Sequence, residues 1–384
     1  MCPRKVEILR VLVRSRTWWA IATLLLILNS GAAPSASSAQ PTADCIIDES
    51  GDLIDEIRSI SGLLPGPGSN GMVVPTTAQM SAWEHLIDAT EAGDLTTACS
   101  IIAAQGFPYR IMRYTDTGYQ DKVYFLLQEN VPISVGWGTY LINVDDLRDI
   151  VIEVPHPGCE LHTEEEGVEL FRQLGARGLV IAGTHRCANT SYSPCSGTTS
   201  FCGQEEPHRT SDVAHATQTM FHAAHRVLAE PGTGSIAVQI HGCSDSSCPD
   251  LFISNTTCEP GELGQRFYRN ALSACQGFSV DIADCAPSEC SLVGTTNVQG
   301  RFSNGSFWLS EFEPCTESSP SPSQPEQFLH LEQSHALRDN FACLAEALRI
   351  TFSETPRQYL PVITSAYVVQ ATGQRSGDDG RYPR

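Results

Sequence analysis

The most informative stretch of the sequence is Ile152-Glu153-Val154-Pro155-His156-Pro157-Gly158-Cys159-Glu160. Residues 149–154 are mostly apolar and β-branched, which predicts a buried strand, and the two prolines and the glycine that follow predict a tight turn. The turn carries an imidazole at His156 and a carboxylate at Glu160. In an open α/β sheet, ligands bind beyond the carboxyl ends of the strands. We therefore expect this turn to hold part of a functional site.

Two later apolar runs end in residues of the same kind. Residues 235–240 are followed by His241, and residues 328–331 are followed by Glu332. Three strand ends would then carry two imidazoles and two carboxylates. This combination predicts a metal site with one additional carboxylate beside it.

From residue 149 onward, expected strands and helices alternate, which is typical of an α/β sheet. Further strands are expected at 178–182 and 278–282, and helices at 163–174, 211–229, 262–275 and 335–352. We predict an α/β fold with a mixed, mostly parallel sheet and helices on both faces, preceded by a small β-containing N-terminal subdomain.

The first 39 residues have the composition of an export signal. Five basic residues precede a short apolar segment at 18–28, and small residues follow at 37–39. A membrane anchor is the alternative, but a spanning helix needs about 20 apolar residues. We expect cleavage near Ala39, and a secreted or periplasmic protein with no stable membrane association.

The chain after the signal divides by composition and by pattern. Residues 40–80 are rich in Pro, Gly, Ser and Thr and are interpreted as a linker with one short helix. A helix at 81–102 and three β-rich runs between 108 and 146 predict a small α+β subdomain at 81–148, in which the strands form an antiparallel meander. The main domain is expected at 149–355, and a tail at 356–384.

The charge restricts the class of partner. The 384-residue chain has a formal net charge of −20, and it would reach −24 without the signal, which holds five of the 24 basic and one of the 44 acidic residues. Such an acidic protein is a poor ligand for nucleic acid or for an anionic membrane. A small molecule or a peptide is the partner that the charge allows.

Cysteine content agrees with export. Fourteen of the fifteen cysteines follow the signal, and an even number in an exported chain predicts disulfide bonds. Three close pairs could form small rings, although the sequence leaves the connectivity open; these pairs are Cys195/Cys202, Cys243/Cys248 and Cys285/Cys290. No cysteine pair has zinc-ribbon spacing, so a structural zinc held by cysteines is not expected.

Eight of the eleven histidines lie between residues 156 and 241. A catalytic zinc site uses three nitrogen, sulfur or oxygen ligands and leaves one position for water. His156, Glu160 and His241 fit this pattern, and Glu332 is placed to accept a proton from the metal-bound water. For any single histidine, a hydrogen-bonded structural role is the simpler interpretation.

Other histidines are rival ligands. His162 could replace Glu160, and the expected helix at 211–229 carries three candidates, of which His215 and His222 would share one face; the third is His225. These alternatives remain open at the level of the sequence.

The segment from Val154 to Leu161 resembles the His-x-x-x-Glu turn of the N-formylglutamate amidohydrolase family, zinc-dependent amide hydrolases related in fold to the zinc carboxypeptidases. The resemblance continues in order through residues 174–189, through the strand that ends at His241, and through residues 329–332, and it spans residues 149–352. It implies a hydrolase fold and one zinc ion per site.

Individual roles follow from this resemblance. It implies that His156, Glu160 and His241 bind zinc, that Glu332 is the general base, and that Arg186 holds a substrate carboxylate or the oxyanion. A salt bridge to a surface acid is the alternative for Arg186. Three further residues are candidates for substrate contact: Asn189, in the same turn as Arg186, and Asn297 and Arg301, in a polar glycine-flanked loop.

The predicted function is metal-dependent hydrolysis of an amide or peptide bond in an N-acyl amino acid or a peptide-like substrate. Two alternatives belong to other classes. One is a non-catalytic extracellular binding protein that keeps the fold and is stabilised by disulfides. The other is a zinc esterase or deacetylase, which the same metal chemistry would allow.

Overall fold

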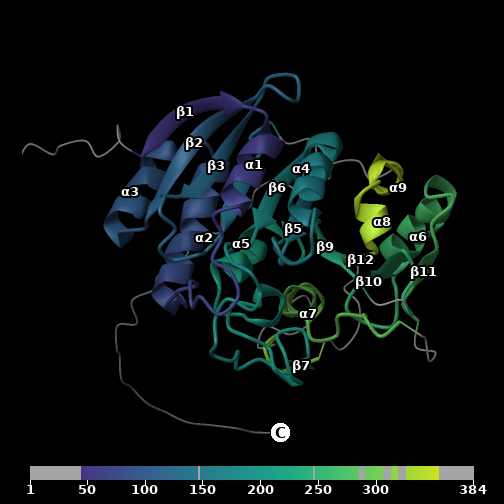
Figure 1. The fold of residues 1–384 in the computed structure, drawn as a ribbon. Helices are drawn as coiled ribbons and strands as arrows, with labels where there is room; N and C mark the ends of the chain where they lie inside the picture. The colour runs from purple at the N-terminus through teal and green to yellow at the C-terminus, as the bar shows by residue number, and fades with distance from the viewer. Residues whose placement is uncertain are drawn as a thin grey trace, which may run out of the picture. The chain divides into compact units, whose positions relative to one another are not determined.

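The apolar run that precedes the His156 turn forms strand β5 (Arg148–Val154), as predicted, within a ten-stranded mixed sheet (Figure 1). The computed structural model describes residues 45–145, 148–244, 247–284, 290–305, 313–318 and 326–353. The expected export signal and C-terminal tail lie outside the described residues. The strand order is β1-β2-β3-β4-β6-β5-β9-β12-β10-β11.

Four parallel strands form the centre of this sheet. They are β6 (Ala176–Ile181), β5, β9 (Ile236–Gly242) and β12 (Phe328–Gln333), in this spatial order. Both faces of these strands are buried; aliphatic residues fill one face, and the other also buries polar residues such as Glu153, Gln239 and His330. Because the strands are parallel, their carboxyl ends meet at one edge of the sheet.

The N-terminal meander is part of the same sheet. β2 (Tyr109–Asp116), β3 (Lys122–Glu129) and β4 (Thr139–Ile142) are antiparallel to one another, and β4 pairs antiparallel with β6. β1 (Ile46–Gly51) pairs in parallel with β2 at the outer edge. The strands were expected in a separate subdomain, but their hydrogen bonds continue the central sheet; the domain boundaries themselves stay a prediction.

The segment interpreted as a linker contains the short helix that was expected within it. Helix α1 (Leu53–Ser61) begins at Asp52, whose side chain accepts a hydrogen bond from the Ile54 amide. The helix buries Leu53, Ile57 and Ile60 at helical spacing and contacts α4 (Thr163–Leu174). Its apolar stripe therefore holds the helix against the core in spite of the Pro- and Gly-rich residues that follow.

Helices cover both faces of the sheet, as predicted (Figure 1). On one face α1 and α4 pack with α6 (Glu262–Ala274) and α9 (Ala342–Ser353). The other face is covered by α2 (Thr77–Glu91), α3 (Leu95–Gln105) and α5 (Met220–Leu228). Ile150 and Ile152 of β5 belong to the first core and Val151 to the second, as strand alternation requires.

Several expected elements are divided differently in the structure. The predicted helix at 211–229 is a 3₁₀ turn, η1 (Val213–His215), and then α5, which starts after the N-cap Thr219. The predicted helix at 335–352 is α8 (His335–Arg338) followed by α9. The polar loop at 294–301 runs into α7 (Val298–Gly305). Three further strand segments complete the described elements: β10 (Leu251–Ser254) and β11 (Val280–Ile282) at the far edge, and the short pair β7 (Thr198–Thr199) and β8 (Glu206–Pro207).

Five disulfide bonds join described residues: Cys45–Cys99, Cys187–Cys202, Cys195–Cys315, Cys248–Cys290 and Cys275–Cys343. All three suggested rings, Cys195/Cys202, Cys243/Cys248 and Cys285/Cys290, are therefore wrong, because Cys195, Cys202, Cys248 and Cys290 each have another partner. Each of these bonds joins segments that the fold brings together, and proximity in sequence did not predict them. Cys159 is not disulfide-bonded, contrary to the expectation of complete pairing.

No helix among the described residues is both long and apolar enough to cross a lipid bilayer.

Candidate metal centre

The central parallel strands bring the predicted ligands to one edge of the sheet. His156 lies two residues beyond the end of β5, and His241 is the second-to-last residue of β9. Glu332 of β12 lies directly opposite His241 in the register of the two strands. Because paired residues of neighbouring strands point to the same face, this register places the Glu332 carboxylate beside the His241 imidazole.

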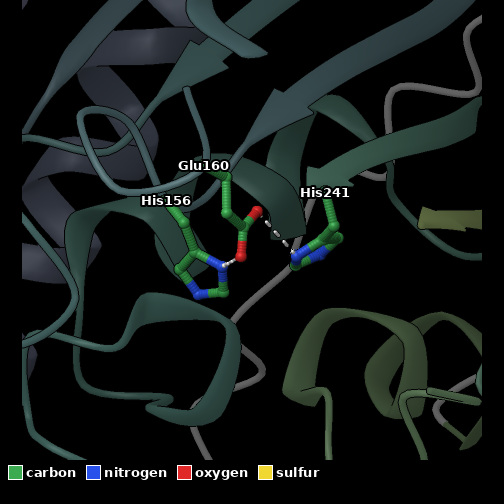
Figure 2. Close-up of side chains that lie close together, drawn as sticks. All are labelled: His156, Glu160 and His241. Carbon is green, nitrogen blue, oxygen red and sulfur yellow. Dashed lines mark hydrogen bonds and ion pairs between the residues drawn. The ribbon is translucent and has the colours of Figure 1, made fainter. Parts of the chain in front are cut away.

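His156, Glu160 and His241 converge on a small volume (Figure 2). Glu160 Oε1 lies 2.6 Å from His156 Nδ1, and Glu160 Oε2 lies 3.4 Å from His241 Nδ1. All three side chains are buried, and their potential ligand atoms lie within 4.8 Å of one another. The set has the composition of a catalytic zinc site, which takes three nitrogen or oxygen ligands and leaves a position open.

The outer nitrogen of each imidazole is hydrogen-bonded. His156 Nε2 donates to Asp212 Oδ1 at 2.9 Å, and His241 Nε2 donates to Gln239 Oε1 at 2.8 Å. A carboxylate and an amide oxygen can only accept, so each bond places a proton on Nε2 and leaves Nδ1 to face Glu160. Histidines that bind metals are commonly oriented by such partners.

Neither Asp212 nor Gln239 was predicted to belong to the site. Gln239 carries a detectable signal, because residues two apart on a strand share a face and Gln239 precedes His241 by two. Its amide nitrogen donates to Glu153 Oε2 at 2.9 Å, so Gln239 is itself held in place. Asp212 lies in a long irregular segment, where spacing contains no information about proximity to His156.

The charge states of Glu160 and His241 suit metal binding, whereas the carboxylates around His156 favour its protonated form. Burial alone would raise the pKa of Glu160, but the His156 and His241 imidazoles outweigh it and hold that pKa well below its ordinary value. Burial lowers the pKa of His241 and favours the neutral imidazole, the form that binds metals. For His156, burial acts in the same direction, but the carboxylates of Glu160 and Asp212 raise its pKa overall.

Arg186 lies directly beside the candidate ligands. Its Nε and Nη2 atoms donate to Asp212 Oδ2 at 3.0 and 2.7 Å, and its Nη1 lies 3.4 Å from Glu160 Oε1. The guanidinium is therefore part of a buried ion pair rather than the surface salt bridge considered as an alternative. Nη1 is the nitrogen that faces two of the ligand side chains, since it also lies 3.4 Å from His156 Nδ1.

These side chains line a cavity of about 480 Å³. Glu332 lines it as well, and burial, together with the nearby Glu160 carboxylate, raises its pKa well above the ordinary value. Among the residues described, the rest of the wall is formed largely by polar side chains and glycines. The volume is within the range of small-molecule sites.

The histidines considered as alternative ligands do not all lie together. His215 lies in η1 and lines the cavity, where its Nδ1 donates to the Thr296 carbonyl at 3.0 Å. His222 and His225 are buried in α5, and His225 Nδ1 is 2.7 Å from Glu153 Oε1. His215 and His222 therefore do not share a helix, because the chain turns between them. His162 is exposed and contacts Glu165 instead of the cavity.

Of the three weaker candidates for substrate contact, one lines the cavity and two do not. Asn297 lines the cavity and donates a hydrogen bond to Gln239 Oε1. Asn189 bonds to the Met72 backbone at 2.9 and 3.1 Å. Arg301 donates to the carbonyl of Thr295 and to the Ser196 hydroxyl. Asn189 and Arg301 are not among the described residues that line the cavity, and their bonds hold loops together.

Cys159 lies between the two ligands of the turn, but its chemistry differs from theirs. Burial raises the pKa of its thiol to about 12, so the protonated form dominates at neutral pH. A thiolate is the form that binds metals and attacks electrophiles. The protonated thiol is therefore a poor nucleophile at neutral pH.

We expect Asp212→Asn to weaken zinc binding by about 10- to 100-fold, because Asp212 orients His156 and also neutralises Arg186. Competition with a chromophoric zinc chelator would measure the change. Asp94→Asn is the matched control, since Asp94 is an exposed helix N-cap that asparagine replaces well. An unchanged zinc affinity in Asp212→Asn would contradict the positioning role.

Comparisons with known proteins found solved structures that resemble this chain in fold. No family model matches the chain, and no curated protein matches it. An N-formylglutamate amidohydrolase from Ralstonia eutropha JMP134 is 13% identical, with a TM-score of 0.32 over 56% of this chain and 96% of that one. A bacteriophage poly-gamma-glutamate hydrolase is 15% identical, with a TM-score of 0.30 over 53% and 83%. A metallo-carboxypeptidase from Burkholderia cenocepacia is 15% identical, with a TM-score of 0.30 over 69% and 67%.

Proposed function

We propose that this protein is an exported, metal-dependent hydrolase that cleaves an amide or peptide bond. The observation that supports the proposal is the meeting of two imidazole Nδ1 atoms and the Glu160 carboxylate, with a second buried carboxylate, Glu332, on the wall of the same cavity. Five disulfide bonds among the described residues support an oxidising compartment.

His156, Glu160 and His241 would hold one zinc ion, which polarises a substrate carbonyl and lowers the pKa of a bound water towards about 7. Glu332 accepts a proton from the attacking water and passes it to the leaving nitrogen. Its raised pKa suits this role, because the carboxyl group must hold the proton between the two transfers.

Arg186 stabilises the charge that develops on the carbonyl oxygen. Its Nη1 faces two of the ligand side chains, while Nε and Nη2 are fixed by Asp212. A buried donor that is already oriented costs little reorganisation when negative charge develops. The proposed substrate is an N-acyl amino acid or a peptide-like molecule, and the small-molecule size of the cavity supports this proposal.

Elemental analysis of the purified protein tests the proposal. We expect about one tightly bound zinc ion per chain, and loss of this ion in His156→Ala and in His241→Ala, because each removes one of three ligands. His85→Ala is the control, since His85 is exposed on α2. Failure to bind zinc after reconstitution would contradict the hydrolase and favour a non-catalytic binding protein.

A further inference from the structure

A second group of metal-binding side chains lies on the surface, separate from the cavity. It consists of His162, which precedes α4, and His335 and Asp339, in and just after α8. Asp339 Oδ1 lies 3.8 Å from His162 Nε2, and Asp339 Oδ2 lies 3.0 Å from His335 Nδ1. The potential ligand atoms of the three residues lie within 4.8 Å of one another, although the segments are far apart in the sequence.

The other nitrogen of His162 is already hydrogen-bonded. His162 Nδ1 lies 3.2 Å from Glu165 Oε2, and Glu165 Oε1 accepts a hydrogen bond of 2.7 Å from Arg58 Nε. Glu165 can only accept, so the His162 proton belongs on Nδ1 and the Nε2 lone pair faces the Asp339 carboxylate. The same order of carboxylate, imidazole and open nitrogen orients metal-binding histidines in proteins.

Two acceptors face each other on one side of Asp339, while His335 Nδ1 lies 3.0 Å from the other carboxylate oxygen, within reach of a hydrogen bond. The lone pair of His162 Nε2 and the Asp339 carboxylate face each other, and His335 adds a second imidazole to the same carboxylate. A cation placed among the three would remove the repulsion. Two imidazoles and one carboxylate form a donor set that zinc accepts, with the fourth position open to water.

We propose that His162, His335 and Asp339 form a surface zinc site, distinct from the candidate centre in the cavity. All three side chains are about half exposed, so an ion can reach them directly from solvent. The site would connect the turn that follows Glu160 to the helix that follows Glu332. Bound zinc therefore joins the two segments next to the cavity, whatever reaction the cavity supports.

Zinc counting by equilibrium dialysis tests this site. Untagged full-length protein, stripped with a chelator, is dialysed against a series of free zinc concentrations, and zinc per chain is measured by mass spectrometry. We expect the wild type to bind about one more zinc ion per chain than the His162→Ala/His335→Ala variant at the higher concentrations. His85→Ala, which removes an exposed histidine outside the cluster, should bind as the wild type does.

Further variants separate this site from the cavity. A His156→Ala/His241→Ala variant should lose the buried ion and keep the surface ion, so failure at one site does not imply failure at the other. Asp339→Asn should weaken the surface site without removing either imidazole, and it provides a second test if the double alanine variant does not fold. Equal zinc content in the wild type and in all surface variants would overturn the proposal.

Discussion

Glu332→Gln should lower kcat by about 100- to 10,000-fold and leave the zinc content unchanged, because the substitution removes a proton acceptor and no candidate metal ligand. Glutamine has nearly the same size as glutamate, so the packing of β12 against β9 should persist. Turnover would be measured on a panel of N-acyl amino acids and short peptides, beside the zinc content of the same preparations.

The control for this experiment is Glu49→Gln, which neutralises an exposed carboxylate of β1 far along the sheet from the cavity. It should retain full activity. If Glu332→Gln and the wild type cleave the same substrate at equal rates, Glu332 is not the general base. A zinc-binding protein without turnover in either form would favour the non-catalytic alternative.

Glu166→Gln should make the protein more stable than the wild type above about pH 8, by as much as about 5 kcal/mol. Glu166 is fully buried in α4, and burial raises the pKa of its carboxyl group from 4.5 to about 8. The folded state therefore holds a proton that the unfolded state releases above about pH 4.5. The free energy of unfolding of the wild type should fall as pH rises from about 4.5 to about 8, and glutamine removes this dependence.

The surroundings of Glu166 agree with a protonated carboxyl group. Gln333 Nε2 donates to Glu166 Oε2 at 3.0 Å, while Glu166 Oε1 and Gln333 Oε1 are buried without a hydrogen-bond partner among the described residues. A proton on the carboxyl group supplies a donor to this pair of acceptors. The raised pKa therefore has a geometric counterpart as well as a cause in burial.

Urea unfolding between pH 5 and pH 9, followed for the metal-free forms, would measure the difference between Glu166→Gln and the wild type. Glu262→Gln is the control, because Glu262 is exposed in the first turn of α6 and should leave the pH dependence unchanged. A constant difference in unfolding free energy across this pH range would mean that Glu166 is ionised in the folded state.

Local pattern predicted the elements that form the candidate centre. The largely apolar runs before His156, before His241 and before Glu332 all form strands, and each residue lies at or just beyond the carboxyl end of its strand. Strands of this type are recognisable because burial on both faces requires a continuous apolar run. The parallel order of these strands then brings the three residues to one edge.

The sequence pattern did not predict contacts made by residues in irregular segments. Asp212 reaches His156 from the chain between β8 and η1, and no periodicity relates the two residues. The disulfide pairing was not predicted for the same reason: Cys195 pairs with Cys315, which is 120 residues away in the sequence. Strand β1 was not predicted within the expected linker, whereas the short helix expected there forms as α1 and packs its apolar stripe against α4.

The amino-acid sequence by itself determined the alternation of strands and helices, the acidic charge, and the three residues that point to a metal site, because these depend on periodicity and on side-chain chemistry. Only the tertiary structure decided which groups surround them. Asp212 and Gln239 orient the two imidazoles, Arg186 is held by Asp212, and His162 lies with His335 and Asp339 on the surface. Apart from the bond between Gln239 and His241 within β9, these contacts join segments distant in the sequence, and they exist only because the folded sheet and its helices fix the distances between them.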